Sequence, residues 1–425
     1  MIKEIERCRI CGGVDLKPII NLGTQSLTGI FPCSTDMKIT SGPLELVRCD
    51  DEHNSNACGL LQLRHSYDLS EMYGLNYGYR SGLNQSMMAH LKAIVTKIQN
   101  LVTLKPGDYV LDIGSNDGTL LSFYNDLPGL QLIGIDPTGT KFKDYYQSRI
   151  QLITEFFSAD EISKHFNSQK MRVVTSISMF YDLEQPLKFV QEVHDVLADD
   201  GVWVLEQSYM PTMLEVTAYD TICHEHLEYY SLKQIKWMAD KVGLKIISVT
   251  LNDTNGGSFC LALAKKSSEY PEAVNEINAL FDKEAKMELD TTAPFLAFTQ
   301  RVSEHKKNLQ NFFTKARKEG KKIFGYGAST KGNVILQYCG ITNHDMPYIA
   351  EVNTDKFGCF TPGTHIPIIS ETQAREMNPD YFFVLPWHFR EGIVEREQSF
   401  VQRGGTLVFP LPTLELVSKS TGQSK

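Results

Sequence analysis

The sequence predicts an α/β protein in which a small cysteine-rich module precedes two open, doubly wound α/β units. Three observations lead to this class. Five of the nine cysteines fall within the first 60 residues, and short apolar runs alternate with amphipathic stretches from about residue 69 to 266. A second series of apolar runs follows a charged, heptad-like stretch at residues 271–319. Such alternation of strand and helix patterns is typical of largely parallel sheets covered by helices.

The length of the chain favours several domains, because 425 residues exceed what one ordinary hydrophobic core holds. We expect the cysteine-rich module in residues 1–68, a first α/β domain in 69–266 and a second in 267–425. No segment approaches the ~18 uninterrupted apolar residues of a membrane helix, and the N-terminus lacks the apolar run of a secretory signal. We therefore expect a cytoplasmic protein. The net charge of −9 disfavours a nucleic-acid partner.

Six apolar runs predict the strands of the first α/β unit, since each is bounded by Gly, Asp or Asn. They are DYVLDIG, LQLIGID, RVVTSIS, GVWVLEQ, GLKIISVT and FCLALAKK, with helical patterns such as PLKFVQEVHDVLAD between them. The strands predicted for the second unit are KKIFGYGA, MPYIAEV, YFFVLPW and GGTLVFPLP. One or two long helices over residues 271–319 would join the two units.

The N-terminal cysteines predict a metal site made of two pairs, Cys8 with Cys11 and Cys49 with Cys58. The two residues inside the first pair let both thiolates face one ion across a tight turn. The loop inside the second pair is longer and would bulge outward. Four thiolates and no open position indicate a structural zinc ion, with His53 in place of one thiolate as the less favoured alternative. Cys33 stands apart, and we expect a buried free thiol there, because cytoplasmic disulfides are rare.

A glycine-rich turn follows the first strand and predicts a ligand site at the carboxyl end of the sheet. Gly114 and Gly118 allow the backbone to approach a ligand closely. Asp112, Asn116 and Asp117 surround the turn. Carboxylates at this position would repel a pyrophosphate, whereas a cation such as a sulfonium with an ammonium group suits them.

The next strand ends at Asp136, where a carboxylate is placed to accept hydrogen bonds from the ribose hydroxyls of an adenosine. We expect the adjacent Pro137 to belong to the same site. Glu155 and Phe156 follow the apolar run QLIT and are expected to frame an adenine ring. A Rossmann-like domain for another nucleotide is the alternative.

The stretch DTICHEHLEYY at residues 220–230 gathers histidines, carboxylates and aromatic residues just beyond the strand GVWVLEQ. His224 and His226 are two residues apart, which is not the spacing of a metal-binding helix motif. We predict a general base instead, because histidine titrates near neutral pH. Glu225 would orient His226 or raise its basicity, and one of the two histidines is expected to be structural only.

A second glycine turn, GYGASTKGN, follows the strand KKIF in the C-terminal unit. It lacks the frame of a Walker P-loop, but a strand, a glycine turn and a helix N-terminus together bind phosphate, to which a lysine adds charge. The alternative is a turn that serves only strand and helix packing. The candidate substrate-binding residues are Gly325, Gly327, Ser329, Lys331 and Asn333, with Glu351 at the end of the next strand facing a ribose.

The segment VLDIGSNDG and Asp136 resemble the first motif and the second-strand acid of class I methyltransferases, which use S-adenosylmethionine. Together with the cysteine pairs, DTICHEHLEYYS, GYGASTKGN and FTPGTHIPI, they make nearly the whole chain resemble the sugar C-methyltransferase family. This resemblance implies a zinc module, a Rossmann-like methyltransferase domain and a Rossmann-like domain that binds a nucleotide sugar. Family members methylate C3 of nucleotide-linked 4-keto-6-deoxyhexoses, in deoxysugar or polysaccharide biosynthesis.

The resemblance also implies roles for single residues. His226 would remove the C3 proton, with His224 and Glu225 in the same cluster, and Tyr79 resembles an N-terminal tyrosine of the family. Ser81 and Arg80 would help to hold the cofactor. Two departures stand out: Cys223 lies where the family can carry a tyrosine, and Tyr181 lies near a position that can be histidine. Tyr181 is expected to replace the imidazole as a donor, and Cys223 cannot replace a phenol.

Two other functions stay open. One is methyl transfer to a different acceptor, such as a sugar oxygen or a non-sugar ketone. The other is a zinc-organised binding protein without catalytic activity, against which Asp112, Gly114, Asp136 and the histidine cluster argue. We expect a monomer or a homodimer with a small-molecule nucleotide-sugar substrate.

Overall fold

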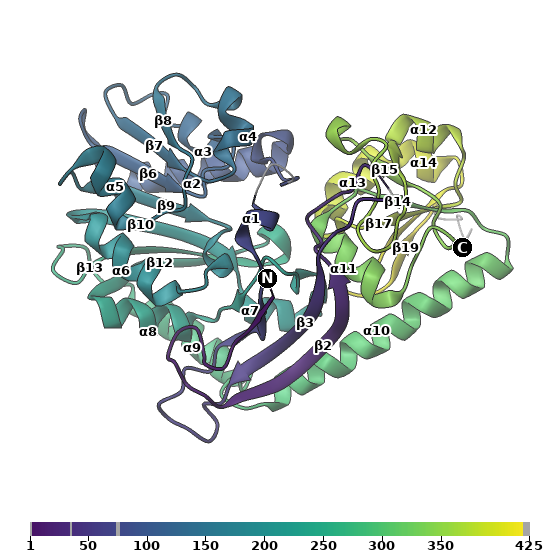
Figure 1. The fold of residues 1–425 in the computed structure, drawn as a ribbon, viewed down its shortest axis with the longest axis horizontal. Helices are drawn as coiled ribbons and strands as arrows, with labels where there is room; N and C mark the ends of the chain where they lie inside the picture. The colour runs from purple at the N-terminus through teal and green to yellow at the C-terminus, as the bar shows by residue number, and fades with distance from the viewer. Residues whose placement is uncertain (1, 35, 74–76, 420–425) are drawn as a thin grey trace, which may run out of the picture.

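The computed structural model describes residues 2–34, 36–73 and 77–419. Two α/β units stand side by side in it, and strands from the N-terminus lie between them (Figure 1). The predicted α/β class is confirmed. Within these described ranges, no helix combines the length and the apolar character that crossing a bilayer requires.

The first α/β unit contains a seven-stranded sheet in the order β12-β13-β10-β9-β6-β7-β8. All six runs predicted as strands are found, and β13 alone runs antiparallel to its neighbours. The chain order reverses between β6 and β9, which opens a crevice at their carboxyl ends. The strands are β6 (Tyr109–Ile113), β7 (Gln131–Ile135), β8 (Ile150–Ile153), β9 (Met171–Ile177), β10 (Leu197–Ser208), β12 (Leu244–Asn252) and β13 (Ser258–Lys265).

Helices accompany this sheet between its strands, as the predicted alternation requires. The stretch PLKFVQEVHDVLAD forms α6 (Pro186–Val196), which begins with proline at a position where its missing N–H costs no hydrogen bond. The other helices of this unit are α2 (Gln85–Leu101), α3 (Thr119–Ser122), α4 (Gly139–Phe142), α5 (Ala159–Phe166), α7 (Met210–Glu215) and α8 (Leu232–Val242), preceded by the short α1 (Leu69–Met72).

The second α/β unit contains a six-stranded sheet in the order β16-β15-β14-β17-β18-β19, parallel except for β19. Its chain order reverses between β14 and β17, so a second crevice is expected there. The strands are β14 (Ile323–Tyr326), β15 (Ile349–Glu351), β16 (Ile368–Ser370), β17 (Tyr381–Val384), β18 (Thr406–Phe409) and β19 (Glu415–Val417). The helices are α11 (Thr330–Cys339), α12 (Glu371–Glu376), α13 (Arg390–Arg396) and α14 (Gln398–Gln402).

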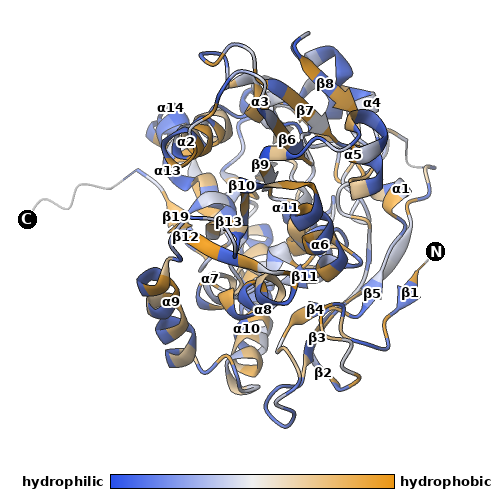
Figure 2. Ribbon diagram, turned by 90° about the vertical axis from the view of Figure 1, so that its left-hand side faces the viewer, coloured by the Kyte–Doolittle hydropathy of each residue, from blue (hydrophilic) through white to orange (hydrophobic). Residues whose placement is uncertain are grey.

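Two helices join the units, as predicted for residues 271–319. They are α9 (Val274–Lys286) and α10 (Ala293–Lys318). Hydrophobic and hydrophilic residues alternate along α9 and α10 in Figure 2, while β12 and β13 are mostly hydrophobic. Each helix therefore buries one face and leaves the other in water.

The N-terminal segment forms a four-stranded sheet that the sequence analysis did not predict. It has the order β11-β4-β3-β2 and borrows β11 (Glu228–Tyr229) from the first α/β unit. The other strands are β2 (Leu16–Ser26), β3 (Ser41–Cys49) and β4 (Leu61–Leu63), beside a two-stranded sheet of β1 (Lys3–Glu4) and β5 (His65–Ser66). Two register shifts interrupt the pairing of β2 with β3, so β2 lacks the regular apolar alternation that identifies a strand.

This N-terminal sheet shares a hydrophobic core with α10 and the second α/β unit. Ile20 and Leu46 belong to the same buried cluster as Phe295 and Phe298. Burying such a side chain contributes about 1.5–3 kcal/mol. The N-terminal segment is therefore packed between the two units, and the domain limits at residues 68 and 266 stay a proposal.

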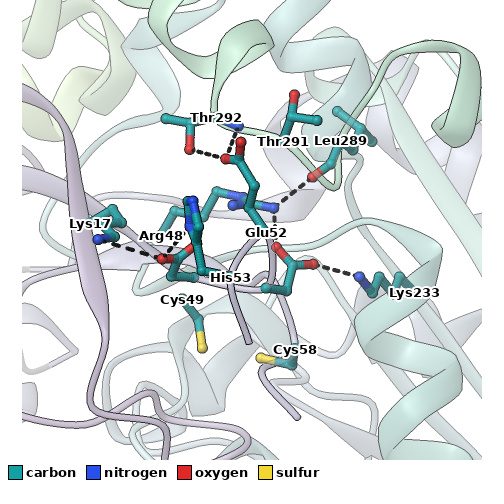
Figure 3. Close-up of polar contacts among 12 residues, drawn as sticks. Lys17, Arg48, Cys49, Glu52, His53, Cys58, Lys233, Leu289, Thr291 and Thr292 are labelled. Carbon is teal, nitrogen blue, oxygen red and sulfur yellow. Dashed lines mark hydrogen bonds and ion pairs between the residues drawn. The ribbon is translucent and has the colours of Figure 1, made fainter. Parts of the chain in front are cut away.

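Polar contacts fix the loop after β3 to the start of α10 (Figure 3). The fully buried Arg48 donates a hydrogen bond to the Leu289 carbonyl at 3.0 Å and pairs with Asp51. The carboxylate of Glu52 accepts bonds from the amide and hydroxyl of Thr292 at 3.0 and 2.8 Å. Lys233 of α8 lies 2.5 Å from Asp51. One loop thus joins the N-terminal sheet, the first unit and α10.

We expect Arg48→Met to destabilise the protein by about 3 kcal/mol, because it leaves the nearly buried Asp51 carboxylate with one partner fewer. Urea unfolding would measure this change. Arg390→Met is the matched control, since Arg390 forms a half-exposed pair with Glu415 and such pairs contribute about 0–1 kcal/mol. Equal losses in the two variants would contradict a structural role for the buried pair.

Candidate functional site

The four predicted metal ligands come together in the structure. The sulfur atoms of Cys8, Cys11, Cys49 and Cys58 all lie within 4.8 Å of one another, with two sulfur–sulfur distances of 3.5 Å. Four thiolates around one zinc ion at about 2.3 Å would lie roughly 3.8 Å apart, so the cluster fits a tetrahedral site. A Cβ atom at Gly13 would stand 3.3 Å from the Cys49 sulfur, which explains a glycine beside the cluster. His53 instead contacts Asp50 and lies outside this set of sulfurs.

The first glycine turn lies at the carboxyl end of β6, in the crevice beside β9. Gly114, Asn116 and Gly118 have φ angles of 72°, 51° and 74°, which only glycine and asparagine adopt readily. A Cβ atom at Gly114 would meet Met179 after β9 at 3.0 Å. The glycines are therefore required by the backbone and by close packing at the crevice.

The predicted ribose acid holds this turn in place. One oxygen of Asp136 accepts a bond from the Asn116 amide at 2.8 Å, and the other accepts two bonds of 2.6 Å from Thr138. Burial raises the pKa of Asp136, while these hydrogen bonds favour its ionised form. A carboxylate offers about four acceptor positions, so one remains for a ligand hydroxyl.

Asp112 is the most deeply placed acid of the turn. It is 3% exposed, and the hydroxyl of Thr175 donates to it at 2.5 Å. Burial raises the pKa of Asp112 to about 7, with a smaller contribution from the negative charge of Asp136. Asp112 therefore changes charge near neutral pH, where a cationic ligand would favour its ionised form.

The segment that carries Tyr79 and Ser81 lies directly on this turn. The side chain of Asn116 donates to the Tyr79 carbonyl at 3.2 Å and accepts from the Ser81 amide at 2.9 Å. Tyr79 exposes 44% of its surface, and partial burial raises the pKa of Tyr79 to about 12. Arg80 lies 3.7 Å from Asp117 and stacks 4.0 Å above the ring of Tyr145. The segment of residues 79–81 thus lies against the first glycine turn.

Three further cofactor predictions lie beyond the next two strands. Pro137 is half-buried after β7, whereas Glu155 and Phe156 follow β8 and are exposed. Half of the surface of Phe156 faces solvent, which leaves an aromatic face open to a flat ligand. Their roles stay predictions.

His226 is held in one tautomer. Its Nδ1 lies 2.9 Å from the carbonyl oxygen of Thr221, which only accepts hydrogen bonds, so Nδ1 carries the proton. No described residue hydrogen-bonds to Nε2, which leaves that lone pair free. The ring centre of Tyr181 lies 4.2 Å from that of His226. Burial lowers the pKa of His226 to about 3, and the charge of Lys331 adds to this shift.

The structure corrects the expected role of Glu225. Thr221, and not Glu225, orients His226, and the pKa of His226 is lowered rather than raised. Glu225 turns toward the N-terminal segment, where the Thr28 hydroxyl donates to it at 3.3 Å. A peptide carbonyl fixes the imidazole tautomer without adding the charge that a carboxylate would bring.

His224 and His226 lie on the loop of residues 222–227, which we call the catalytic loop because it carries the predicted base, and the two side chains have different neighbours. It is fully buried, packs edge-on against Tyr67 at 4.6 Å and lies 3.5 Å from the Gly42 carbonyl. Burial lowers the pKa of His224 to about 4, so it is neutral at pH 7. These contacts are those of a packing residue, as expected for one of the two histidines.

The second glycine turn repeats the construction of the first. Glu351 accepts bonds from the amides of Ala328, Val352 and Asn353 at 2.7–2.9 Å, as Asp136 does at its own turn. Gly327 has a φ of 80°, and a Cβ atom there would meet Pro386 after β17 at 2.7 Å. Each turn thus lies at the carboxyl end of its sheet, where the strand order reverses.

The other predicted substrate residues differ in what they contact. Gly325 lies inside β14, where a Cβ atom would meet Ile349 at 2.6 Å, so packing accounts for it. Ser329 caps α11 by accepting from the Gly332 amide at 3.0 Å. Asn333 is buried and donates to the Thr28 carbonyl at 2.8 Å.

Lys331 brings the second unit to the catalytic loop. Its amine donates to the Asn255 carbonyl of the first unit at 2.9 Å, and its charge acts on Asp220, His226 and His388. Burial lowers the pKa of Lys331, and Asp220 opposes this shift. The Trp387 indole also donates to Asp220 at 2.8 Å. Residues at the second crevice, Lys331 and Trp387, thus act directly on the loop that carries Asp220 and His226.

The sequence analysis did not predict several polar residues that lie at the carboxyl ends of the two sheets. His90 and Glu206 form a 2.5 Å pair at the carboxyl end of β10, and Lys356 donates to the Ala328 carbonyl at 2.8 Å. No local motif marks them, because their partners are distant in sequence.

A cavity of about 340 Å³ beside Lys322 and Tyr348 lies near the opposite, amino end of β14, so we assign it no part in this site.

Comparisons with known proteins find family matches over nearly the whole chain. A zinc binding domain family matches residues 8–73, a methyltransferase domain family matches residues 84–249, and a C-methyltransferase C-terminal domain family matches residues 253–412. These matches confirm an enzyme of the methyltransferase class, with S-adenosylmethionine as its cofactor and a structural zinc ion.

Two known methyltransferases are similar to the chain in sequence. The C-methyltransferase NovU of Streptomyces niveus is 26% identical over 422 residues, which cover 98% of each chain. The sphingolipid C9-methyltransferase of Komagataella phaffii is 30% identical over a region that covers 43% of this chain and 50% of the relative. Among solved structures, the PH0226 protein of Pyrococcus horikoshii OT3 matches 44% of this chain and 95% of its own, with 16% identity and a TM-score of 0.35.

We expect the purified protein to contain one zinc ion per chain, measurable by elemental analysis. Cys11→Ser should lose the ion and several kcal/mol of stability, since structural zinc contributes on the order of 10 kcal/mol in zinc-finger peptides. Cys260→Ser is the control, because Cys260 lies on β13 outside the cluster and should retain zinc. Full zinc content in Cys11→Ser would rule out this ligand set.

We expect the affinity for S-adenosylmethionine to rise about tenfold from pH 6 to pH 8, because Asp112 ionises near pH 7 and its carboxylate attracts a cation. Asp112→Asn should flatten this profile in calorimetric titrations. S-adenosylhomocysteine, which lacks the sulfonium charge, is the matched ligand and should show a weaker dependence. An unchanged slope in Asp112→Asn would contradict the assignment.

Proposed function

We propose that the chain is a sugar C-methyltransferase that methylates C3 of a nucleotide-linked 4-keto-6-deoxyhexose. The observation that carries the proposal is His226, whose Nε2 is free beside Tyr181 and the charge of Lys331. A ketone at C4 makes the C3 proton acidic, so one base and one donor suffice to form an enolate. We further propose that the protein works in the cytoplasm in deoxysugar or polysaccharide biosynthesis.

His226 is the proposed base. The Thr221 carbonyl keeps the proton on Nδ1, so Nε2 can accept a second proton and form an imidazolium. In the free protein, burial and Lys331 hold the pKa of His226 near 3. A bound diphosphate would offset the charge of Lys331, which removes one of the two causes and makes His226 more basic when substrate is present.

Tyr181 is the proposed donor for the developing oxyanion. It is 7% exposed, and burial raises its pKa well above the ordinary value, so the phenol stays protonated. A protonated hydroxyl beside the base can donate to the C4 oxygen as charge builds there. This is the exchange of imidazole for phenol that the sequence suggested, and Cys223 takes no comparable part because it is a fully buried thiol with a raised pKa.

The glycine turns are the proposed binding sites for the two ligands. S-adenosylmethionine, when bound, supplies an electrophilic methyl group. Asp112, Asp136 and the segment at Tyr79 would hold and orient it at the first turn, where the carboxylates favour a cation. Lys331 and Ser329 at the second turn would hold the diphosphate of the sugar. The two crevices would bring the two ligands together at His226.

We expect His226→Ala to lower deuterium uptake at C3 of the substrate by 10²–10⁴-fold, the range that a positioned base contributes. The assay incubates the protein with a panel of nucleotide 4-keto sugars in deuterated water, without cofactor, and follows exchange by mass spectrometry. Tyr181→Phe should lower exchange less, because it removes a donor but leaves the base.

The control for this experiment is the affinity for S-adenosylmethionine, which His226→Ala should leave within about twofold of the original value. His165→Ala, on the exposed face of α5, should change neither quantity. Methyl transfer to a sugar oxygen without any carbon-bound exchange would contradict the proposal and favour the alternative acceptor.

A further inference from the structure

A segment of the N-terminal module lies along the second α/β unit. We call residues 26–33 the strap. Its Ser26 amide donates to the Gln337 side chain at 2.8 Å, and Asn333 donates to the Thr28 carbonyl at the same distance. Both partners belong to α11, the helix that follows the second glycine turn. The strap therefore follows the helix that carries the proposed diphosphate site.

The opposite side of the strap meets the catalytic loop. Thr28 donates to Glu225 at 3.3 Å, and Gly29 approaches the same carboxylate so closely that a Cβ atom would stand 2.5 Å from it. The Gly29 carbonyl lies within 3.6 Å of the position that a Cβ atom would take on Gly78, next to Tyr79. The strap thus contacts α11 of the second unit on one side and Glu225 and Gly78 on the other.

A disulfide bond fixes the far end of the strap. Cys33 and Cys359 are bonded although 326 residues separate them in the sequence, which corrects the expectation of a free buried thiol at Cys33. The Phe360 amide also donates to the Pro32 carbonyl at 2.8 Å. Cys359 shares its loop with Lys356, which stacks 4.2 Å from the Phe31 ring and donates to the Ala328 carbonyl of the glycine turn.

The two sulfur atoms differ in access. Cys33 is exposed, whereas Cys359 is 2% exposed. Disulfide exchange begins when a thiolate attacks one sulfur, and its rate depends on access to that sulfur. A small thiol would therefore reach Cys33 first. The remaining described cysteines are the four of the metal cluster and three buried ones. Outside the metal cluster, Cys33 is therefore the described cysteine whose sulfur a small thiol can reach.

We propose that Cys33 and Cys359 form a reversible thiol–disulfide modification site that clamps the strap onto the second unit and thereby tightens binding of the anionic substrate. In the reducing direction, one small thiolate attacks the Cys33 sulfur, which forms a mixed disulfide and releases the Cys359 thiolate. A second small thiol then displaces the first and leaves the Cys33 thiol. Two thiols are oxidised to one small-molecule disulfide, and the two electrons and two protons pass to Cys33 and Cys359.

The clamp acts mainly on the acceptor half of the site, although the strap also touches Gly78 beside Tyr79. Its contacts reach Lys356, the second glycine turn and Glu225, whereas Asp112 and Asp136 are held by Thr175, Thr138 and Asn116 within the first unit. Opening the disulfide should therefore loosen the strap and the Lys356 loop while cofactor binding stays as it was. The expected change in affinity for the nucleotide sugar rests on the proposed function, whereas the expected loosening of the strap does not.

The test compares air-oxidised and phosphine-reduced protein by hydrogen exchange, with zinc content checked in both states. In the oxidised protein, peptide mapping should find Cys33 linked to Cys359. Reduction should make amide exchange in residues 28–33 and 354–360 about tenfold faster, since local opening loses its cross-link. It should raise the KM for the nucleotide sugar about fivefold or more, and leave the affinity for S-adenosylmethionine within twofold.

Cys33→Ser is the matched variant, because Cys33 is exposed and its replacement spares the core. It should behave like the reduced protein and should not respond to the reductant. Complete alkylation of Cys33 in the oxidised protein would overturn the proposal, as would an equal response of Cys33→Ser and wild type to reduction. If no nucleotide sugar is methylated, the proposed function fails. The hydrogen-exchange measurement still tests whether the disulfide bond holds the strap.

Discussion

The packing of the N-terminal sheet against α10 and the second α/β unit is the constraint on which the site depends. Ile20, Leu46, Phe295 and Phe298 belong to one core, so the N-terminal strands cannot move independently of the C-terminal half. The same strands share β11 with the first unit. The N-terminal sheet thus sets how far apart the two glycine turns lie. The cysteine cluster and the contacts of Arg48 in turn hold this sheet in place.

The two α/β units use the same device for their turns. In each, an acid at the end of the second strand accepts a hydrogen bond from a backbone amide of the turn after the first strand: Asp136 from Asn116, and Glu351 from Ala328. Such a bond fixes the turn before any ligand arrives, which lowers the ordering cost of binding. The turns differ in their charges, since the first is surrounded by carboxylates and the second carries Lys331.

The sequence predicted what local pattern controls. Strands bounded by Gly and Asp, both glycine turns and the cysteine pairs were identified, because alternation and spacing are visible within a few residues. What was missed depends on distant partners. The N-terminal sheet was hidden by the register shifts of β2, and Thr221 replaced Glu225 as the partner of His226 because loop geometry decides the hydrogen bond. The pairing of Cys33 with Cys359 has no local signal at all.

The shared core has a consequence for the synthesis of the chain. The strands that carry Ile20 and Leu46 leave the ribosome first, but their cover on α10 follows roughly 250 residues later, on the order of 10–50 s at ordinary rates of translation. During that interval the part of the sheet face that packs on α10 lacks this partner. The nascent N-terminal module is therefore exposed to aggregation until α10 is made, and a fragment that stops before α10 would keep that face uncovered.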